Sequence, residues 1–175
     1  MDGSFVGGRG IDDFEPVRAD FIEAAEAYLN RIAALDEHTE LDVREMHGTL
    51  ADLQAGAARL SGSVQLGEAG HRSTYAAIEK LSYDELRRRL RRLPLDSYFV
   101  TFDPFDAASP PVLATIADDL ADIYDDLVTG FEKRASDGLV RAIDTWELLY
   151  YSHWGRHAVH AQTALWQYLA NRELD

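Results

Sequence analysis

The sequence contains no cysteine among its 175 residues. Disulfide bonds, thiolate metal ligands and cysteine nucleophiles are therefore excluded, and any metal site has to use histidine and carboxylate ligands. The GxSxG, P-loop, dinucleotide-binding and HExxH patterns are also missing. The common signatures of nucleophilic, phosphoryl-transfer, hydride-transfer and zinc-protease chemistry are thus absent.

Basic residues are scarce, with 17 lysines and arginines against 31 acidic residues and a formal net charge of −14. Affinity for nucleic acid depends on neutralising phosphates with lysine and arginine, so we expect no nucleic-acid partner. An acidic surface favours cations or basic groups instead. We expect another protein or a small molecule as the partner, with the oligomeric state left open.

Long apolar runs are missing too, because no stretch approaches the ~18 residues that would span a bilayer. The first residues lack the basic start and apolar core of a secretory signal, so we expect a cytoplasmic protein without membrane contact. With 46% hydrophobic residues, the chain suits one domain with a sizeable core. We predict a glycine-rich flexible tail over residues 1–11 and a single domain over residues 12–175.

Apolar residues recur at steps of three and four along four segments, residues 13–35, 43–60, 113–131 and 139–166. This period predicts four long amphipathic helices. A short helix is predicted over residues 81–93, where Pro94 would end it. We therefore predict an all-α fold, an antiparallel bundle of four long helices plus one short helix, with the C-terminal helix central.

The central position follows from two apolar stripes on the last predicted helix. One stripe carries His153, His157 and His160, and the other runs nearly opposite through Leu148, Tyr151, Gly155, Val159 and Trp166. A helix that is apolar on two sides is most simply packed on two sides. Gly155 then marks the close approach of another backbone, and Trp146 and Trp154 are expected to be largely buried.

Five aspartates share one side of the helix predicted over residues 113–131: Asp118, Asp119, Asp122, Asp125 and Asp126. Carboxylates at this spacing near histidines one turn apart can hold Zn, Mn or Fe in a helical bundle. The candidate ligands are His153, His157, Asp119 and Asp122. The favoured interpretation is a solvated acidic face with hydrogen-bonded core histidines, in which no cofactor is expected and the metal is the alternative. Only Asp119 and Asp126 border the apolar side closely enough to reach a core edge.

Residues 95–111 form a proline-punctuated connection with four aromatic residues, Tyr98, Phe99, Phe102 and Phe105. We favour a lid that seals one end of the bundle, and the alternative is an aromatic-walled pocket containing Tyr98 and Phe102. The basic patch Arg87 to Arg92 has two interpretations as well. A solvated face that pairs with nearby carboxylates is favoured over an anion or partner site.

Three segments have a distinctive sequence: SYFVTFDPF at residues 97–105, IADDLADIYDDL at 116–127, and Trp146 followed by HWGRHA at 153–158. Together they resemble an uncharacterised bacterial family, the domain of unknown function numbered 5063. The resemblance implies a small all-helical domain and assigns no catalytic role. The signature positions that it implies are Asp118, Asp119, Asp122, Tyr124, His153, Trp154, Gly155 and His157.

Two functions from different classes follow. The leading one is a binding or interaction module without catalysis. The alternative is a metal-dependent hydrolase, with a His/Asp site between the last two long helices and Asp119 or Asp122 as ligand or general base. Whether the protein is an enzyme is left open at this point.

Overall fold

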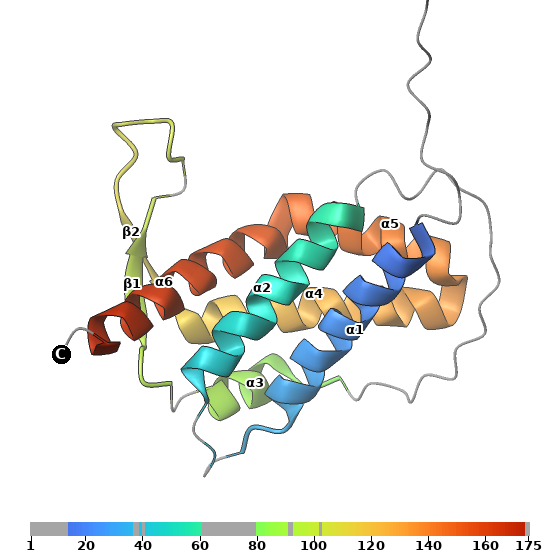
Figure 1. Cartoon of the computed structure of the whole chain (residues 1–175), viewed down its shortest axis with the longest axis horizontal. Helices are drawn as coiled ribbons and strands as arrows, with labels where there is room; N and C mark the ends of the chain where they lie inside the picture. The colour runs from blue at the N-terminus through green and yellow to red at the C-terminus, as the bar shows by residue number, and fades with distance from the viewer. Residues whose placement is uncertain are drawn as a thin grey trace, which may run out of the picture.

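The computed structural model describes residues 14–36, 39, 41–60, 80–90, 93–101 and 103–173. The tail predicted over residues 1–11 lies outside these ranges. Figure 1 shows the arrangement of the elements. In chain order they are α1 (Phe14–Ala33), α2 (Val43–Leu60), α3 (Tyr83–Arg89), β1 (Ser97–Val100), β2 (Val112–Thr115), α4 (Ile116–Asp137), α5 (Leu139–Leu149), a π-helical segment η4 (Tyr150–Trp154) and α6 (Gly155–Glu173).

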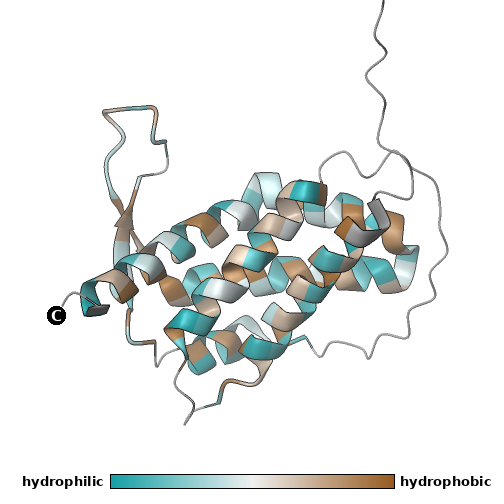
Figure 2. Cartoon of the chain, in the orientation of Figure 1, coloured by the Kyte–Doolittle hydropathy of each residue, from teal (hydrophilic) through white to brown (hydrophobic). Residues whose placement is uncertain are grey.

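The fold is mostly α-helical, as the apolar period predicts. Helix α1 packs on α2, α4 packs on α5, and α6 lies against both α2 and α4. Figure 2 shows hydrophobic residues returning turn by turn along the helices; in α1, Phe21, Ala25, Tyr28 and Ile32 are fully buried. Among the described helices, none is long and apolar enough to cross a membrane.

Trp146 and Trp154 form the centre of the core, and both are fully buried as predicted. The indole N–H of Trp146 donates to the carbonyl of Leu127 at 3.0 Å, and that of Trp154 donates to the carbonyl of Trp146 at 3.3 Å. The Phe21 ring meets Trp146 edge-on at 5.3 Å. Both buried indoles therefore satisfy their polar group while they fill the space between α1, α4 and α5.

The helix predicted over residues 139–166 is interrupted by the π-helical segment η4. The backbone N–H of Gly155 bonds to the carbonyl of Tyr150, five residues back, which adds a residue to that turn. A Cβ on Gly155 would lie 2.3 Å from that carbonyl oxygen and 2.8 Å from the Tyr150 ring. Gly155 therefore marks a close approach, but the approaching group belongs to the same helix. The prediction that the backbone of another helix approaches Gly155 is therefore wrong.

We expect Gly155→Ala to destabilise the protein by about 1–3 kcal/mol, because the added methyl group overlaps a backbone oxygen that the wide turn fixes. Chemical denaturation measures the effect. Gly48→Ala is the matched control, since a Cβ there meets nothing within 4 Å. In the control, the helix propensity of alanine should raise stability by about 0.5–1 kcal/mol. A Gly155→Ala protein as stable as the control would contradict the π-turn clash.

The second apolar stripe of the C-terminal helix faces solvent. Its large side chains are between 48% and 67% exposed: Leu148, Tyr151, Val159 and Trp166. The prediction that this helix is packed on two sides, which was the reason for placing it centrally, is therefore wrong. Helix α6 instead covers α2 and α4 with one face and leaves the other uncovered by any residue that the structure describes.

The aromatic connection is a β-hairpin at one end of the bundle (Figure 1). Strands β1 and β2 pair antiparallel, with Phe99 opposite Leu113. Successive side chains of a strand point to opposite faces, so Tyr98 turns toward the bundle and Phe99 turns outward. Phe99 and Phe105 are exposed, which makes the predicted aromatic lid wrong. Phe102 lies outside the described residues.

Candidate metal centre

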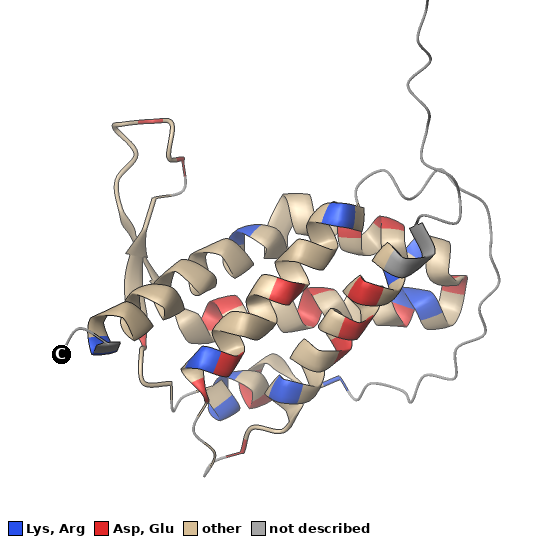
Figure 3. Cartoon of the chain, in the orientation of Figure 1, with Lys and Arg blue, Asp and Glu red and all other residues tan. Residues whose placement is uncertain are grey.

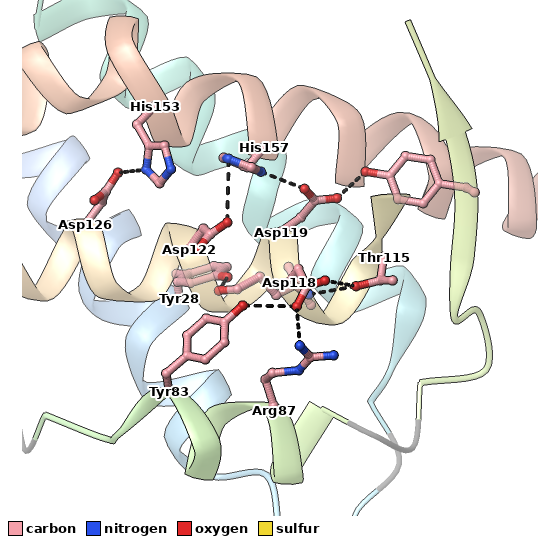
Figure 4. A network of polar contacts seen from close by, with 12 residues as sticks. Tyr28, Tyr83, Arg87, Thr115, Asp118, Asp119, Asp122, Asp126, His153 and His157 are labelled. Carbon is pink, nitrogen blue, oxygen red and sulfur yellow. Dashed lines mark hydrogen bonds and ion pairs between the residues drawn. The ribbon is translucent and has the colours of Figure 1, made fainter. Parts of the chain in front are cut away.

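The candidate site lies where one face of α4 meets the junction of η4 and α6. Asp119, Asp122 and Asp126 follow one another at steps of three and four residues, so they share a face of α4. His153 and His157 stand one turn apart on the facing helix. Asp126 contacts His153 and Asp119 contacts His157, so the two helices run antiparallel here (Figure 4).

Each histidine ring is oriented by a carboxylate. Nδ1 of His153 lies 2.7 Å from Oδ2 of Asp126, and Nδ1 of His157 lies 2.7 Å from Oδ1 of Asp119. The other oxygen of Asp119 accepts a hydrogen bond from the hydroxyl of Tyr98, which β1 supplies. A carboxylate on Nδ1 fixes the ring and leaves Nε2 for a second partner.

The two supporting carboxylates are buried, with Asp119 4% and Asp126 9% exposed. This confirms the prediction that these two could reach a core edge. Burial raises the pKa of Asp126, and the neighbouring His153 opposes that rise. The hydrogen bond to Asp119 raises the pKa of His157. The two buried carboxylates therefore each take a histidine ring nitrogen as a hydrogen-bond partner.

Asp122 differs from its two neighbours because it lacks a hydrogen-bond donor among the residues that the structure describes. The nearest basic group is Nε2 of His157, 3.6 Å from Oδ2 of Asp122, which is too long for a hydrogen bond. Burial raises the pKa of this carboxyl, against the attraction of His157 and His153. The side chain of Asp122 keeps 29% of its surface exposed, and a cation beside it would favour its ionised form.

The donor atoms are spaced for one shared ion. One donor atom each from Asp122, His153 and His157 lies within 4.8 Å of the other two. Two ligands of a tetrahedral zinc ion, each about 2.1 Å from it, are separated by about 3.4 Å. The 3.6 Å between Asp122 and His157 is close to that value.

Asp118 points away from the histidines, toward α3 (Figure 4). It accepts from the hydroxyl of Tyr83 at 3.0 Å and from the hydroxyl of Thr115 at 2.7 Å, and it pairs with Arg87 at 3.1 Å. Its backbone N–H in turn bonds to Thr115, which caps α4. Asp118 therefore starts α4 and anchors α3, and it takes no part in the candidate site.

The basic patch behaves as its favoured interpretation predicts where the structure describes it. Arg87 pairs with Asp118, while Arg88 and Arg89 both pair with Glu85. Arg91 and Arg92 lie outside the described residues. Of the remaining signature positions, Tyr124 and Trp154 are buried in the core, and Gly155 serves the π-turn.

Two residues have roles at the site that the sequence did not predict, although Asp126 was expected to border the core and Tyr98 to line a possible pocket. Asp126 supports His153, and Tyr98 supports Asp119 from the hairpin. Asp119 was predicted as a metal ligand, but it contacts Nδ1 of His157, whereas Nε2 is the nitrogen that faces Asp122. The spacing offered a signal for Asp126. It lies two turns from Asp119 on the same face of the helix, with Asp122 between them.

Comparison with known proteins finds one family. The model of a family described as a domain of unknown function (DUF5063) matches residues 12–171. No curated protein and no solved structure matches the chain. The family match spans every helix and strand of the bundle except the last residues of α6.

Proposed function

We propose that this chain, which belongs to the domain-of-unknown-function family DUF5063, binds one divalent transition-metal ion between α4 and α6. The ligands are Asp122 and the Nε2 atoms of His153 and His157. One observation carries the proposal: the carboxylate of Asp122 has no donor among the described residues and lies beside two imidazoles that other carboxylates orient. Such carboxylate–histidine pairs are the usual support of a metal site.

The ligand types favour zinc. Two imidazoles and one carboxylate suit Zn, Fe or Mn, whereas Mg²⁺ and Ca²⁺ prefer oxygen ligands throughout. Nitrogen and oxygen ligands in a tetrahedral arrangement are most typical of zinc. Zinc is therefore the first ion to test, with manganese and iron as the comparisons.

The charges around the ion limit what else can bind there. A divalent ion with Asp122, Asp119 and Asp126 ionised and both histidines neutral gives the cluster a charge of about −1. An anionic fourth ligand is therefore disfavoured, which argues against a phosphorylated substrate. The ion would chiefly join α4 to α6, as in a binding module without catalysis.

A metal-dependent hydrolase is the second candidate, and one observation favours it. The site offers three protein ligands, and catalytic zinc sites typically have three protein ligands and a bound water. That water would become the nucleophile when the ion lowers its pKa. The two candidates share the same ligands, so one binding experiment tests the common premise.

Asp122→Asn tests the ligand set, because the substitution removes a ligand charge without breaking a hydrogen bond. We expect the wild-type protein to bind one equivalent of zinc in isothermal titration. The variant should lose more than about a hundredfold in affinity, since even supporting residues are worth ten- to a hundredfold. In chelator, the variant should unfold at the same urea concentration as the wild type or a higher one, because the carboxylate removed accepts no hydrogen bond from a described residue.

Asp125→Asn is the matched control. Asp125 lies on the same helix, is exposed and pairs with Lys80 at 3.3 Å outside the site. It should keep the wild-type zinc affinity. Equal affinities for the wild type and Asp122→Asn would overturn the proposal, as would equal losses in both variants, which would indicate a general effect of charge.

A further inference from the structure

The C-terminal helix, whose exposed side carries large apolar side chains, contains most of the longest segment of the described chain without acidic residues. The molecule carries 31 aspartates and glutamates, yet none occurs from Leu148 to Arg172. That segment contains Arg156 and Arg172 instead. Figure 3 shows the contrast between α6 and the acidic positions on the other helices.

Three exposed side chains form a line along this side, and we call them the α6 ridge: Tyr151, Val159 and Trp166. Val159 and Trp166 are seven residues apart, about two α-helical turns. Tyr151 precedes Val159 by eight residues. Two turns take about eight residues here, because one of them is the wider turn of η4 and the other is an α-helical turn. The π-helical segment therefore brings Tyr151 into line with the other two. The ridge is about 22 Å long.

We propose that the α6 ridge binds a second copy of this chain, with the two α6 helices antiparallel about a two-fold axis at Val159. A two-fold interface has to be self-complementary. Val159 lies eight residues after Tyr151 and seven before Trp166. In the antiparallel arrangement Tyr151 of each copy therefore meets Trp166 of the other, and the two Val159 side chains meet at the axis.

Charge favours a second copy over a basic partner. Two copies with a net charge of −14 each repel one another wherever acidic residues face each other. Along the α6 ridge that local repulsion is weak, because no acidic residue occurs from Leu148 to Arg172. A basic partner would find no carboxylate on the segment from Leu148 to Arg172, where Arg156 carries the same sign of charge as that partner. The remaining repulsion is long-range, so added salt should strengthen the dimer.

The interface is small, because one helix pair buries less than the roughly 800 Å² per partner of a standard complex. We therefore expect micromolar dissociation constants, and sedimentation velocity up to about 0.5 mM protein covers that range. The sedimentation coefficient of the full chain should rise with concentration toward the value of a dimer. The rise should begin at lower concentration when sodium chloride is added.

Trp166 supplies a second readout, since it is the exposed tryptophan of the three. Quenching of its fluorescence by acrylamide should fall as the dimer forms. Val159→Glu places two carboxylates at the axis and should weaken association by at least about tenfold. Ala135→Glu, at an exposed position of α4, carries the same charge and should associate like the wild type. Circular dichroism checks that both variants are folded.

Three results would overturn the proposal. A wild-type protein that stays monomeric at the highest concentration and salt has no such interface. A dimer that Val159→Glu leaves unchanged uses another surface. A monomer whose Trp166 resists acrylamide at every concentration has the ridge covered by its own chain.

Discussion

His157→Ala is expected to abolish zinc binding and also to destabilise the metal-free protein by about 3 kcal/mol or more. The substitution removes a ligand and leaves Asp119, whose side chain is 5% exposed, with Tyr98 as its remaining partner at the site. For a chain of this length, such a loss lowers the thermal midpoint by roughly 10 °C. Urea denaturation in chelator and zinc titration measure the two effects separately.

His153→Ala provides the comparison. It also removes a ligand, so zinc binding should be lost to a similar extent. The His153 side chain is 43% exposed against 17% for His157, so the metal-free protein should lose less stability. Zinc affinity that survives His157→Ala would exclude this ring as a ligand. Equal stability losses in the two variants would contradict the difference in burial.

Gly130→Ala is expected to cost about 3 kcal/mol or more, the upper end of what overpacking a core costs. A Cβ at Gly130 would lie 1.9 Å from the indole nitrogen of Trp146 and 2.3 Å from two further ring atoms. The indole is fully buried and bonded to Leu127, and the Phe131 ring packs against it edge-on at 4.9 Å. The ring therefore has no free space into which to move.

Urea denaturation of Gly130→Ala beside Gly48→Ala measures this effect. The two substitutions are chemically identical and both lie within helices, but a Cβ at Gly48 meets nothing within 4 Å. The difference between them isolates the contact with Trp146 from helix propensity. Equal stabilities would show that α4 and α5 can separate without cost at this point.

The long helices could be predicted from the sequence because their buried residues repeat with the helical period. The π-turn at Tyr150 could not, since one added residue leaves the local sequence as helical as before. The strands at Ser97–Val100 and Val112–Thr115 were missed because four residues are too few to show alternation. Both features enter the proposed sites, because the hairpin supplies Tyr98 and the π-turn aligns the α6 ridge.

At the candidate site, helical spacing could predict that His153 and His157 share a face and that Asp119 borders the core. It could not predict which carboxylate contacts which ring. That depends on the axial register of α4 against α6, which the packing of Trp146 and Trp154 across the core sets. The register pairs Asp119 with His157 and Asp126 with His153, and it leaves Asp122 opposite both rings.

A crystal structure of the protein grown with zinc, with anomalous differences collected at the zinc edge, locates the ion itself. We predict one strong peak about 2.0–2.2 Å from a carboxylate oxygen of Asp122 and from Nε2 of His153 and His157. Asp126 and Asp119 should keep their hydrogen bonds to the Nδ1 atoms. No peak at this position, with zinc bound only to surface carboxylates elsewhere, would contradict the metal centre.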